Sequence, residues 1–396
     1  MLDEQYHAKQ CDRCKTYFDK QEHDYADWEI DYPPYGTSEG MMSRECQTCD
    51  YIDHKVIPAI KPTLEQRIAG EESADTAAQI ALEAFPGGSE WVVIARDDDF
   101  ADAMSATGLA GALDAPIVLT DRNELSGATA DAVKKLGAKK AYIVGGTGAI
   151  PGDLEGALEK IGCKVKERVF GQEAYDTSAE CAKLIQETVG GGTPYAVVAY
   201  GQNFQDALSM SSFAYRHKCP IFLQTYGDTS AERALTDDAK AMLTGDGAWA
   251  GAQVFVAGGN GAVSEASAER LLGKGRVVRL AGEDGFDTSN QIATYMVENG
   301  LLSASTVCVA NGAEKPKGTD ALAGAALAGR KGGVMLLANA NGACGEVSRA
   351  TIEGTDSKGD PAFLTEHAGE VSDAYVLGGS YVMPEDFRAE INGILR

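Results

Sequence analysis

The chain has 396 residues, 44% of them hydrophobic and 24% charged, which suits a globular protein of about three domains and an appendage. A net charge of −24 and a pI near 4.6 disfavour a nucleic-acid partner, because an acidic chain repels polyanions and no strong basic patch is visible. The apolar runs are shorter than the roughly 18 residues that indicate a membrane span. The start, Met1 to Glu4, lacks the features of a signal peptide, so we expect either a cytoplasmic protein or a fragment of a longer precursor.

Residues 1–60 are rich in Asp, Tyr, His and Lys and poor in aliphatic side chains. Two Cys-x-x-Cys pairs lie here: Cys11, Cys14, Cys46 and Cys49. Each pair offers two thiolates on a tight turn, so the spacing predicts a structural zinc site in a small ribbon-like domain. A segment of this size needs a bound metal ion or a similar cross-link to stay folded. Disulfide bonding is the alternative, which an extracellular location would favour, and His7, His23 or His54 could replace a ligand.

After a linker at Pro58 to Thr63, the chain repeats one unit three times, with expected bounds 64–166, 167–277 and 278–396. Each unit opens with an Arg, then a Gly, then an Asp-Thr pair. An apolar strand, a recurring Asp, a small-residue helix and further strands follow. One of these strands runs into a Gly pair in each unit: Gly145-Gly146, Gly258-Gly259 and Gly378-Gly379. The recurring charged residues are Arg67, Arg168 and Arg279, and Asp102, Asp206 and Asp320. Repetition over about 100 residues indicates tandem domains rather than a solenoid.

Within the first unit, helical and apolar patterns alternate. The pattern predicts helices at 73–85, 101–113, 128–136 and 154–161, and strands from Val92 and at 117–119, 141–144 and 164–169. Short, continuously apolar strands separated by helices indicate a parallel sheet covered on both faces. We therefore expect an α/β fold of three small Rossmann-like units.

Ligands of such sheets bind beyond the carboxyl ends of the strands, where the recurring Asp residues and the Gly pairs are expected. A structural interpretation competes with this one. Asp in the first turn of a helix stabilises the helix dipole, Asp-Thr pairs are good helix starters, and Gly after a strand serves the turn. The recurring Arg could likewise form only a buried salt bridge to the recurring Asp.

A catalytic site is not apparent from the sequence. The string Gly145 to Ile150 lacks the G-x-G-x-x-G spacing of a dinucleotide loop. Asp97, Asp98 and Asp99 cluster after the first strand, but the matching loops of the other units contain no carboxylates there. No set of nucleophile, base and orienting group recurs. The other five cysteines lie among apolar or small residues, as buried thiols usually do: Cys163, Cys181, Cys219, Cys308 and Cys344.

The combined pattern resembles the cell wall binding repeat 2 family. It consists of Arg-x-x-Gly-x-x-x-x-Asp-Thr, then Phe-Ala-Asp-Ala-Met-Ser-Ala, Ala-Pro-Ile-Val-Leu-Thr and Ile-Val-Gly-Gly-Thr-Gly-Ala-Ile. Members of that family carry three tandem copies, in agreement with residues 67–396. The resemblance implies Rossmann- or toprim-like units in a pseudo-threefold arrangement. The Cys46 to Tyr51 string is similar, more weakly, to small cysteine repeats of such surface proteins.

The resemblance further implies a non-catalytic module that anchors a surface protein of Gram-positive bacteria, non-covalently, to an anionic secondary polysaccharide of the cell wall. It implies an extracellular location and further domains of a larger protein as neighbours. The ligand-binding residues that we expect are the recurring ones, the arginines as a source of positive charge and the aspartates from their place at the carboxyl ends of the strands: Arg67, Arg168, Arg279, Asp102, Asp206 and Asp320.

The chain departs from the family pattern at one informative place. Where members often have Asp-Arg-Tyr before the Thr, it reads Glu72-Ser73-Ala74, Glu173-Ala174-Tyr175 and Asp284-Gly285-Phe286. Positive charge for an anionic polymer must then come from the three recurring arginines or from the clusters 216–218 and 330–331. The alternatives are a scaffold or adhesive module without polymer binding, and a hydrolase built on the Asp97 to Asp102 loop.

Overall fold

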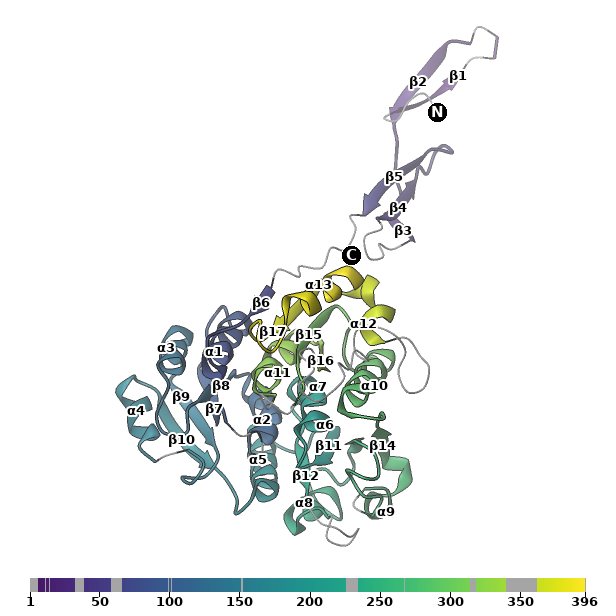
Figure 1. Ribbon diagram of the computed structural model, residues 1–396. Helices are drawn as coiled ribbons and strands as arrows, with labels where there is room; N and C mark the ends of the chain where they lie inside the picture. The colour runs from purple at the N-terminus through teal and green to yellow at the C-terminus, as the bar shows by residue number, and fades with distance from the viewer. Residues whose placement is uncertain are drawn as a thin grey trace.

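The computed structural model describes residues 6–10, 12–13, 15–32, 39–57, 66–98, 100, 102–150, 152–225, 234–266, 268–313, 318–339 and 362–395. Three four-stranded parallel sheets form a body, and the strands of the N-terminal segment, residues 6–57, lie outside it (Figure 1). The α/β class and the three tandem units predicted from the sequence are confirmed.

Each sheet has the same strand order, and its central strands are continuously apolar and buried. The first sheet contains β7 (Trp91–Arg96), β8 (Ile117–Thr120), β9 (Lys140–Val144) and β10 (Lys164–Val169), in the order β10-β9-β7-β8. The second contains β11 (Tyr195–Tyr200), β12 (Ile221–Gln224), β13 (Gln253–Ala257) and β14 (Val277–Leu280), in the order β12-β11-β13-β14. The third contains β15 (Thr306–Asn311), β16 (Val334–Ala338), β17 (Asp373–Leu377) and β6 (Gln66–Ile68), in the order β16-β15-β17-β6.

The third sheet closes the body into a ring. Its last strand, β6, precedes the first repeat in the sequence, yet it pairs in parallel with β17 near the end of the chain. The amide of Gly378 donates to the carbonyl of Ile68 at 2.9 Å. Each repeat therefore begins with a strand that hydrogen-bonds to the sheet of the repeat before it, and the predicted boundaries 166/167 and 277/278 fall within β10 and β14.

Helices cover the sheets and join the repeats. In the first repeat they are α1 (Ser73–Ala84), a 3₁₀ turn at Ala103–Ser105, α2 (Ala106–Leu113), α3 (Gly127–Leu136) and α4 (Leu154–Lys160). In the second they are α5 (Ala174–Val189), α6 (Phe204–Ser209), α7 (Ser211–His217), α8 (Asp237–Leu243), α9 (Glu269–Leu272) and a 3₁₀ turn at Lys274–Arg276. In the third they are α10 (Gly285–Glu298), α11 (Thr319–Lys331), α12 (Phe363–Glu366), a 3₁₀ turn at Ala368–Glu370 and α13 (Glu385–Ile394).

The centre of the body is formed by α2, α7 and α11, one helix from each repeat, which pack against one another. Their small residues permit this close approach. A Cβ added at Gly111 would lie 2.1 Å from the carbonyl oxygen of Tyr215, and one at Gly108 would lie 2.1 Å from that of Cys219. The first helix of each repeat also packs on the preceding repeat, since α5 contacts α2, α10 contacts α6 and α1 contacts α11. The three repeats therefore share one core.

The single helix predicted over residues 101–113 is wrong in detail, because a 3₁₀ turn precedes a shorter α-helix there. The N-terminal segment forms two small antiparallel sheets instead of packing on the body. They contain β1 (Tyr6–Gln10) and β2 (Tyr17–Glu22), and β3 (Glu29–Tyr32), β4 (Gly40–Glu45) and β5 (Ile52–Ile57). Arg44 lies over the rings of Tyr25 and Trp28 and pairs with Asp53 at 2.8 Å.

Among the helices of the described residues, none has both the length and the apolar composition needed to cross a membrane.

Candidate functional site

The recurring arginines hold the Gly-pair loops at the carboxyl edge of each sheet. Arg168 donates to the carbonyl oxygens of Gly145 and Ile150 and pairs with Glu155 at 2.8 Å. The second junction repeats the arrangement, where Arg279 donates to the loop carbonyls of residues 258 and 263. Its guanidinium group also donates to both carboxylate oxygens of Glu269, at 2.7 and 2.8 Å.

The third junction uses the ring-closing strand. Arg67 of β6 donates to the carbonyl of Met383 and pairs with Glu385 at 3.2 Å, with its side chain 13% exposed. Arg67, Arg168 and Arg279 thus each bridge one loop to the start of the following helix. Each of the three arginines pairs with a Glu at the start of the following helix. The structural interpretation had considered the recurring Asp as the partner.

The recurring Gly and Asp-Thr residues form a tight turn at the start of the first helix. Thr177 accepts a hydrogen bond from the amide of Gly171, and Asp176 accepts one from Glu173 at 3.2 Å. A Cβ at Gly171 would lie 2.1 Å from the Cβ of Asp176, so only glycine fits there. The same contacts recur at Gly70 and Gly282. The structural interpretation of the Asp-Thr pairs accounts for these residues.

Asp102, Asp206 and Asp320 lie under the Gly-pair loops. A Cβ added at Gly258 would lie 2.4 Å from Oδ2 of Asp206, and one at Gly378 would lie 2.6 Å from Oδ2 of Asp320. Both glycines have positive φ, at 102° and 109°, which glycine adopts without strain. Burial raises the pKa of Asp206 and of Asp320 to about 6. The six predicted ligand residues therefore gather at one edge of each sheet, where Asp206 and Asp320 are buried and Asp102 is partly exposed.

A hollow of about 460 Å³ opens at this edge of the first sheet. It lies between β7 and β9, where the strand order reverses and where parallel sheets most often bind ligands. Its lining comes from three chain segments: Arg96 and Asp102, Gly146 to Ala149, and Phe170 to Ala174. Two adjacent repeats therefore contribute to it.

The acidic loop after β7 lies beside this hollow. Arg96 pairs with Asp98, and this hydrogen bond lowers the pKa of Asp98. Burial, together with Asp121 and Asp98, raises the pKa of Asp97 to about 6. Asp99 lies outside the described residues. The corresponding loops of the other repeats lack this group of carboxylates, so it is a feature of one repeat alone.

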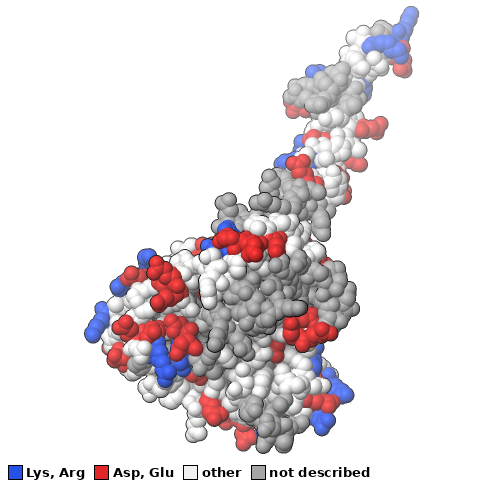
Figure 2. Space-filling model, in the orientation of Figure 1, with Lys and Arg blue, Asp and Glu red and all other residues white. Residues whose placement is uncertain are grey.

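A group of seven exposed lysines lies at the opposite edge of the first sheet. Helices α3 and α4 end there and β9 and β10 begin there, so the lysines of these termini are brought together. They are Lys134, Lys135, Lys139, Lys140, Lys160, Lys164 and Lys166. Lys164 of β10 lies next to Lys140 of β9 in the strand register. Figure 2 shows basic groups interspersed with acidic ones along the side of the body that carries α3 and α4. Lys134 pairs with Asp131 at 3.3 Å and Lys140 with Glu90 at 2.7 Å.

Sequence reasoning missed this lysine group. The signal was present in the doublets 134–135 and 139–140, followed by three lysines between residues 160 and 166. Of the basic clusters considered from the sequence, Arg330, Lys331 and His217 are engaged in contacts within the body, whereas Arg216 and Lys218 are exposed. Arg330 pairs with Asp114 at 3.0 Å and Lys331 with Asp373 at 3.5 Å, while His217 packs on Phe213 and hydrogen-bonds the carbonyl of Leu301.

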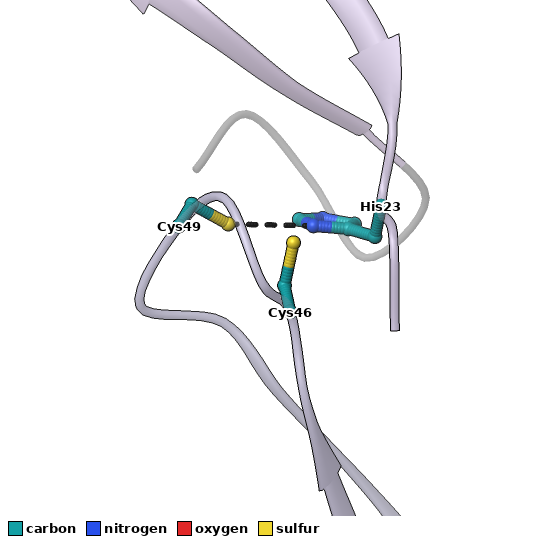
Figure 3. Close-up of side chains that lie close together, drawn as sticks. All are labelled: His23, Cys46 and Cys49. Carbon is teal, nitrogen blue, oxygen red and sulfur yellow. Dashed lines mark hydrogen bonds between the residues drawn. The ribbon is translucent and has the colours of Figure 1, made fainter. Parts of the chain in front are cut away.

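The N-terminal sheets bring together three possible metal ligands. One ligand atom each from His23, Cys46 and Cys49 lies within 4.8 Å of the others, and these side chains point toward one another (Figure 3). Nδ1 of His23 lies 3.4 Å from Sγ of Cys49. Burial acts to raise the pKa of Cys46, but hydrogen bonds from Thr48, His23 and the Asp24 backbone lower it to about 5.

Two thiols and an imidazole are a donor set that fits zinc. Cys46 and Cys49 supply the two thiols, whereas Cys11 and Cys14 lie outside the described residues. The four cysteines predicted as buried thiols in the described body are buried, and burial raises their pKa: Cys163, Cys181, Cys219 and Cys308. Cys344 lies outside the described residues.

Comparison with known proteins relates the repeats to one family. The family model described as cell wall binding domain 2 (CWB2) matches residues 67–155, 168–268 and 279–388. Over 275 residues the chain is 30% identical to N-acetylmuramoyl-L-alanine amidase LytC of Bacillus subtilis, an alignment that covers 69% of this chain and 50% of LytC. The chain thus spans about half the length of that relative.

Two solved structures from Clostridium difficile share the fold. Cwp6 matches with a TM-score of 0.69 and 18% identity, over 90% of this chain and 57% of Cwp6. Cwp8 matches with a TM-score of 0.67 and 20% identity, over 94% of this chain and 63% of Cwp8.

Proposed function

The chain belongs to the cell wall binding domain 2 family, and on that premise we propose that it is a non-catalytic module that anchors a bacterial surface protein to an anionic cell-wall polysaccharide. Binding is non-covalent and takes place at the cell surface. Family membership across all three repeats carries this proposal. LytC and both Cwp proteins are longer than the matched region, which supports further domains as neighbours in a larger protein.

We do not propose a catalytic activity for this chain from its similarity to the amidase LytC. The chain corresponds to half of that protein. In the chain itself, the recurring charged residues are engaged in holding loops: each recurring Arg bonds loop carbonyls and a Glu, and each Asp-Thr pair fixes a helix start. Residues committed in this way favour a rigid binding surface.

The positive charge that an anionic polymer requires is supplied, in this proposal, by the lysine group of the first repeat. Between residues 134 and 166 the chain has seven lysines and three acidic residues, although its overall charge is −24. The helix dipole can explain the lysines at the helix ends. It does not explain Lys164 and Lys166, which are exposed on the strand β10. A local patch of this kind attracts a polyanion at short range and is screened by salt.

Changing Lys139, Lys164 and Lys166 together to glutamine tests this assignment. We expect affinity for purified Gram-positive cell walls to fall about tenfold at roughly 0.1 M salt, and the difference to vanish near 1 M salt. Co-sedimentation over a salt series measures both effects. The control changes Lys55, Lys218 and Lys274, which are exposed elsewhere, and alters the net charge equally. Equal weakening by both triple variants would contradict a local site.

A scaffold function without polymer binding is the second candidate. It is favoured by the internal use of Arg67, Arg168 and Arg279, whose guanidinium groups bond loop carbonyls and glutamates. In that case neither triple lysine variant would change behaviour, and the wild-type chain would not sediment with walls.

We further propose that the N-terminal domain binds one structural zinc ion through Cys46 and Cys49, with His23 as a third ligand and Cys11 or Cys14 completing the set. The convergence of His23, Cys46 and Cys49 supports the first three ligands. The assignment of Cys11 and Cys14 rests on their Cys-x-x-Cys spacing alone.

Zinc removal provides the test. We expect one zinc per chain by elemental analysis, and faster amide exchange in β4 after chelation while β7 keeps its protection. His23→Ala distinguishes the ligand sets: loss of zinc supports the histidine, and full retention supports four cysteines. A zinc-free chain with Cys46 in a disulfide would contradict the site.

A further inference from the structure

Two exposed aromatic side chains lie at the carboxyl edges of the parallel sheets. In the described part of the body, the large apolar side chains that are exposed are Phe170, Val189, Leu271 and Tyr381. The two aromatic ones lie at equivalent edges of different sheets. Phe170 follows β10 directly and is 50% exposed, whereas Tyr381 lies in the Gly-pair loop after β17 and is 86% exposed.

The aromatic residues occupy positions that are small in the other repeats. The residue two after the recurring Arg is Phe170 at the first junction, but Ala281 and Ala69 at the others. The fourth residue of the loop is Tyr381 in the third repeat, but Gly148 and Gly261 elsewhere. Since the fold accepts small residues at these positions, the aromatic rings are not required by the common core.

Phe170 stands between two hollows. One is the cavity of about 460 Å³ that contains Asp102 and the loop glycines. The other, of about 320 Å³, runs between β10 and α5 and is lined by Glu180, Lys183 and Glu187. A Cβ added at Gly146 would lie 3.2 Å from Cδ2 of Phe170, so the ring is supported by the loop backbone. An apolar ring is thus held in place with charged and polar groups on both sides.

We propose that Phe170 and Tyr381 are stacking platforms for sugar rings, and that the edges of the first and third sheets are two carbohydrate subsites of the wall polymer. The C–H face of a pyranose ring is apolar and packs on an aromatic face, while its hydroxyl groups hydrogen-bond at the rim. At the first subsite, Glu173, Gln172 and Thr147 surround Phe170 with such partners. Among the described residues, the edge of the second sheet has no exposed aromatic ring, which makes the three edges unequal. This inference rests on the proposed function.

A sugar fits these positions better than a protein partner does. A protein interface requires a contiguous surface of about 800 Å² per partner with an apolar centre. The two aromatic rings here lie at the edges of different sheets, and Phe170 adjoins two hollows that are lined by charged and polar as well as small residues. Single aromatic rings beside polar groups suit a ligand whose units each present one apolar face.

Wall binding by substituted full-length chains tests the proposal. We expect Phe170→Leu and Tyr381→Leu each to weaken binding to purified Gram-positive walls about two- to tenfold, and the double variant to weaken it further. Phe170→Tyr and Tyr381→Phe keep an aromatic face and should bind like the wild type. The control Val189→Ala with Leu271→Ala removes exposed apolar groups away from these positions and should have no effect.

The outcomes distinguish failure of the stacking proposal from failure of the proposed function. If the wild type binds walls and both leucine variants bind equally well, the stacking proposal is overturned while the proposed function stands. If the control weakens binding as much as the leucine variants, non-specific apolar contact replaces stacking. If the wild type does not bind walls, both fail together.

Discussion

Arg279→Met is expected to lower the free energy of unfolding by about 3–5 kcal/mol, because it removes one partner of a largely buried ion pair and leaves the other uncompensated. Glu269 would lose a bidentate contact at 2.7 and 2.8 Å, and two loop carbonyls would lose their donor. Denaturant unfolding of the variant and the wild type measures the change.

A matched control lies nine residues away. Arg270 pairs with Glu265 at 2.9 Å, but its side chain is 71% exposed, and surface pairs of this kind contribute about 0–1 kcal/mol. Arg270→Met should therefore unfold almost like the wild type. If Arg279→Met instead keeps its stability and loses wall binding, the arginine is a ligand-binding residue, as the family resemblance implied.

The arginine contact also gives the stability a defined pH dependence. The hydrogen bond from Arg279 lowers the pKa of Glu269 below its ordinary value near 4.5. The stabilising contact is therefore fully present above that value and is lost as the pH falls through the lower pKa of the folded chain. The Arg279→Met variant should lack this part of the acid sensitivity.

Removing the ring-closing strand is expected to have the second large effect. A chain that starts at residue 70 lacks β6 and leaves the edge of β17 unpaired, whereas one that starts at residue 58 retains β6. The shorter chain loses the buried Ile68 and the contacts of Arg67 with Met383 and Glu385. We expect its melting temperature to fall by roughly 5–10 °C, and the exposed edge to promote self-association.

The two truncated chains differ mainly in β6, so the comparison isolates ring closure from the N-terminal domain. Calorimetry measures the melting temperature and size-exclusion chromatography measures association. The same melting temperature in both chains would mean that the pairing of β6 with β17 contributes little to the body.

Local sequence signals located the elements of the body well. The strand predicted at 164–169 and the helix at 128–136 agree with β10 and α3 to within one residue, because apolar runs and turn residues bound them. The threefold repetition of Arg, Gly and Asp-Thr also identified a common turn. These features depend on residues close together in the sequence.

The contacts that the sequence did not reveal join distant parts of the chain. The pairing of β6 with β17 connects residues about 310 positions apart, and no local pattern specifies it. The pairing of the three arginines with Glu155, Glu269 and Glu385 was likewise not predicted; the recurring Asp had been considered as a partner instead. The lysine group was missed because it is assembled from two helix ends and two strand starts.

The most direct test of the central claim is co-sedimentation of the unmodified chain with intact Gram-positive walls and with walls stripped of their secondary polysaccharides, each at low and high salt. The proposed function predicts strong retention on intact walls at low salt, weaker retention at high salt, and little on stripped walls. Equal recovery with intact and stripped walls would contradict it.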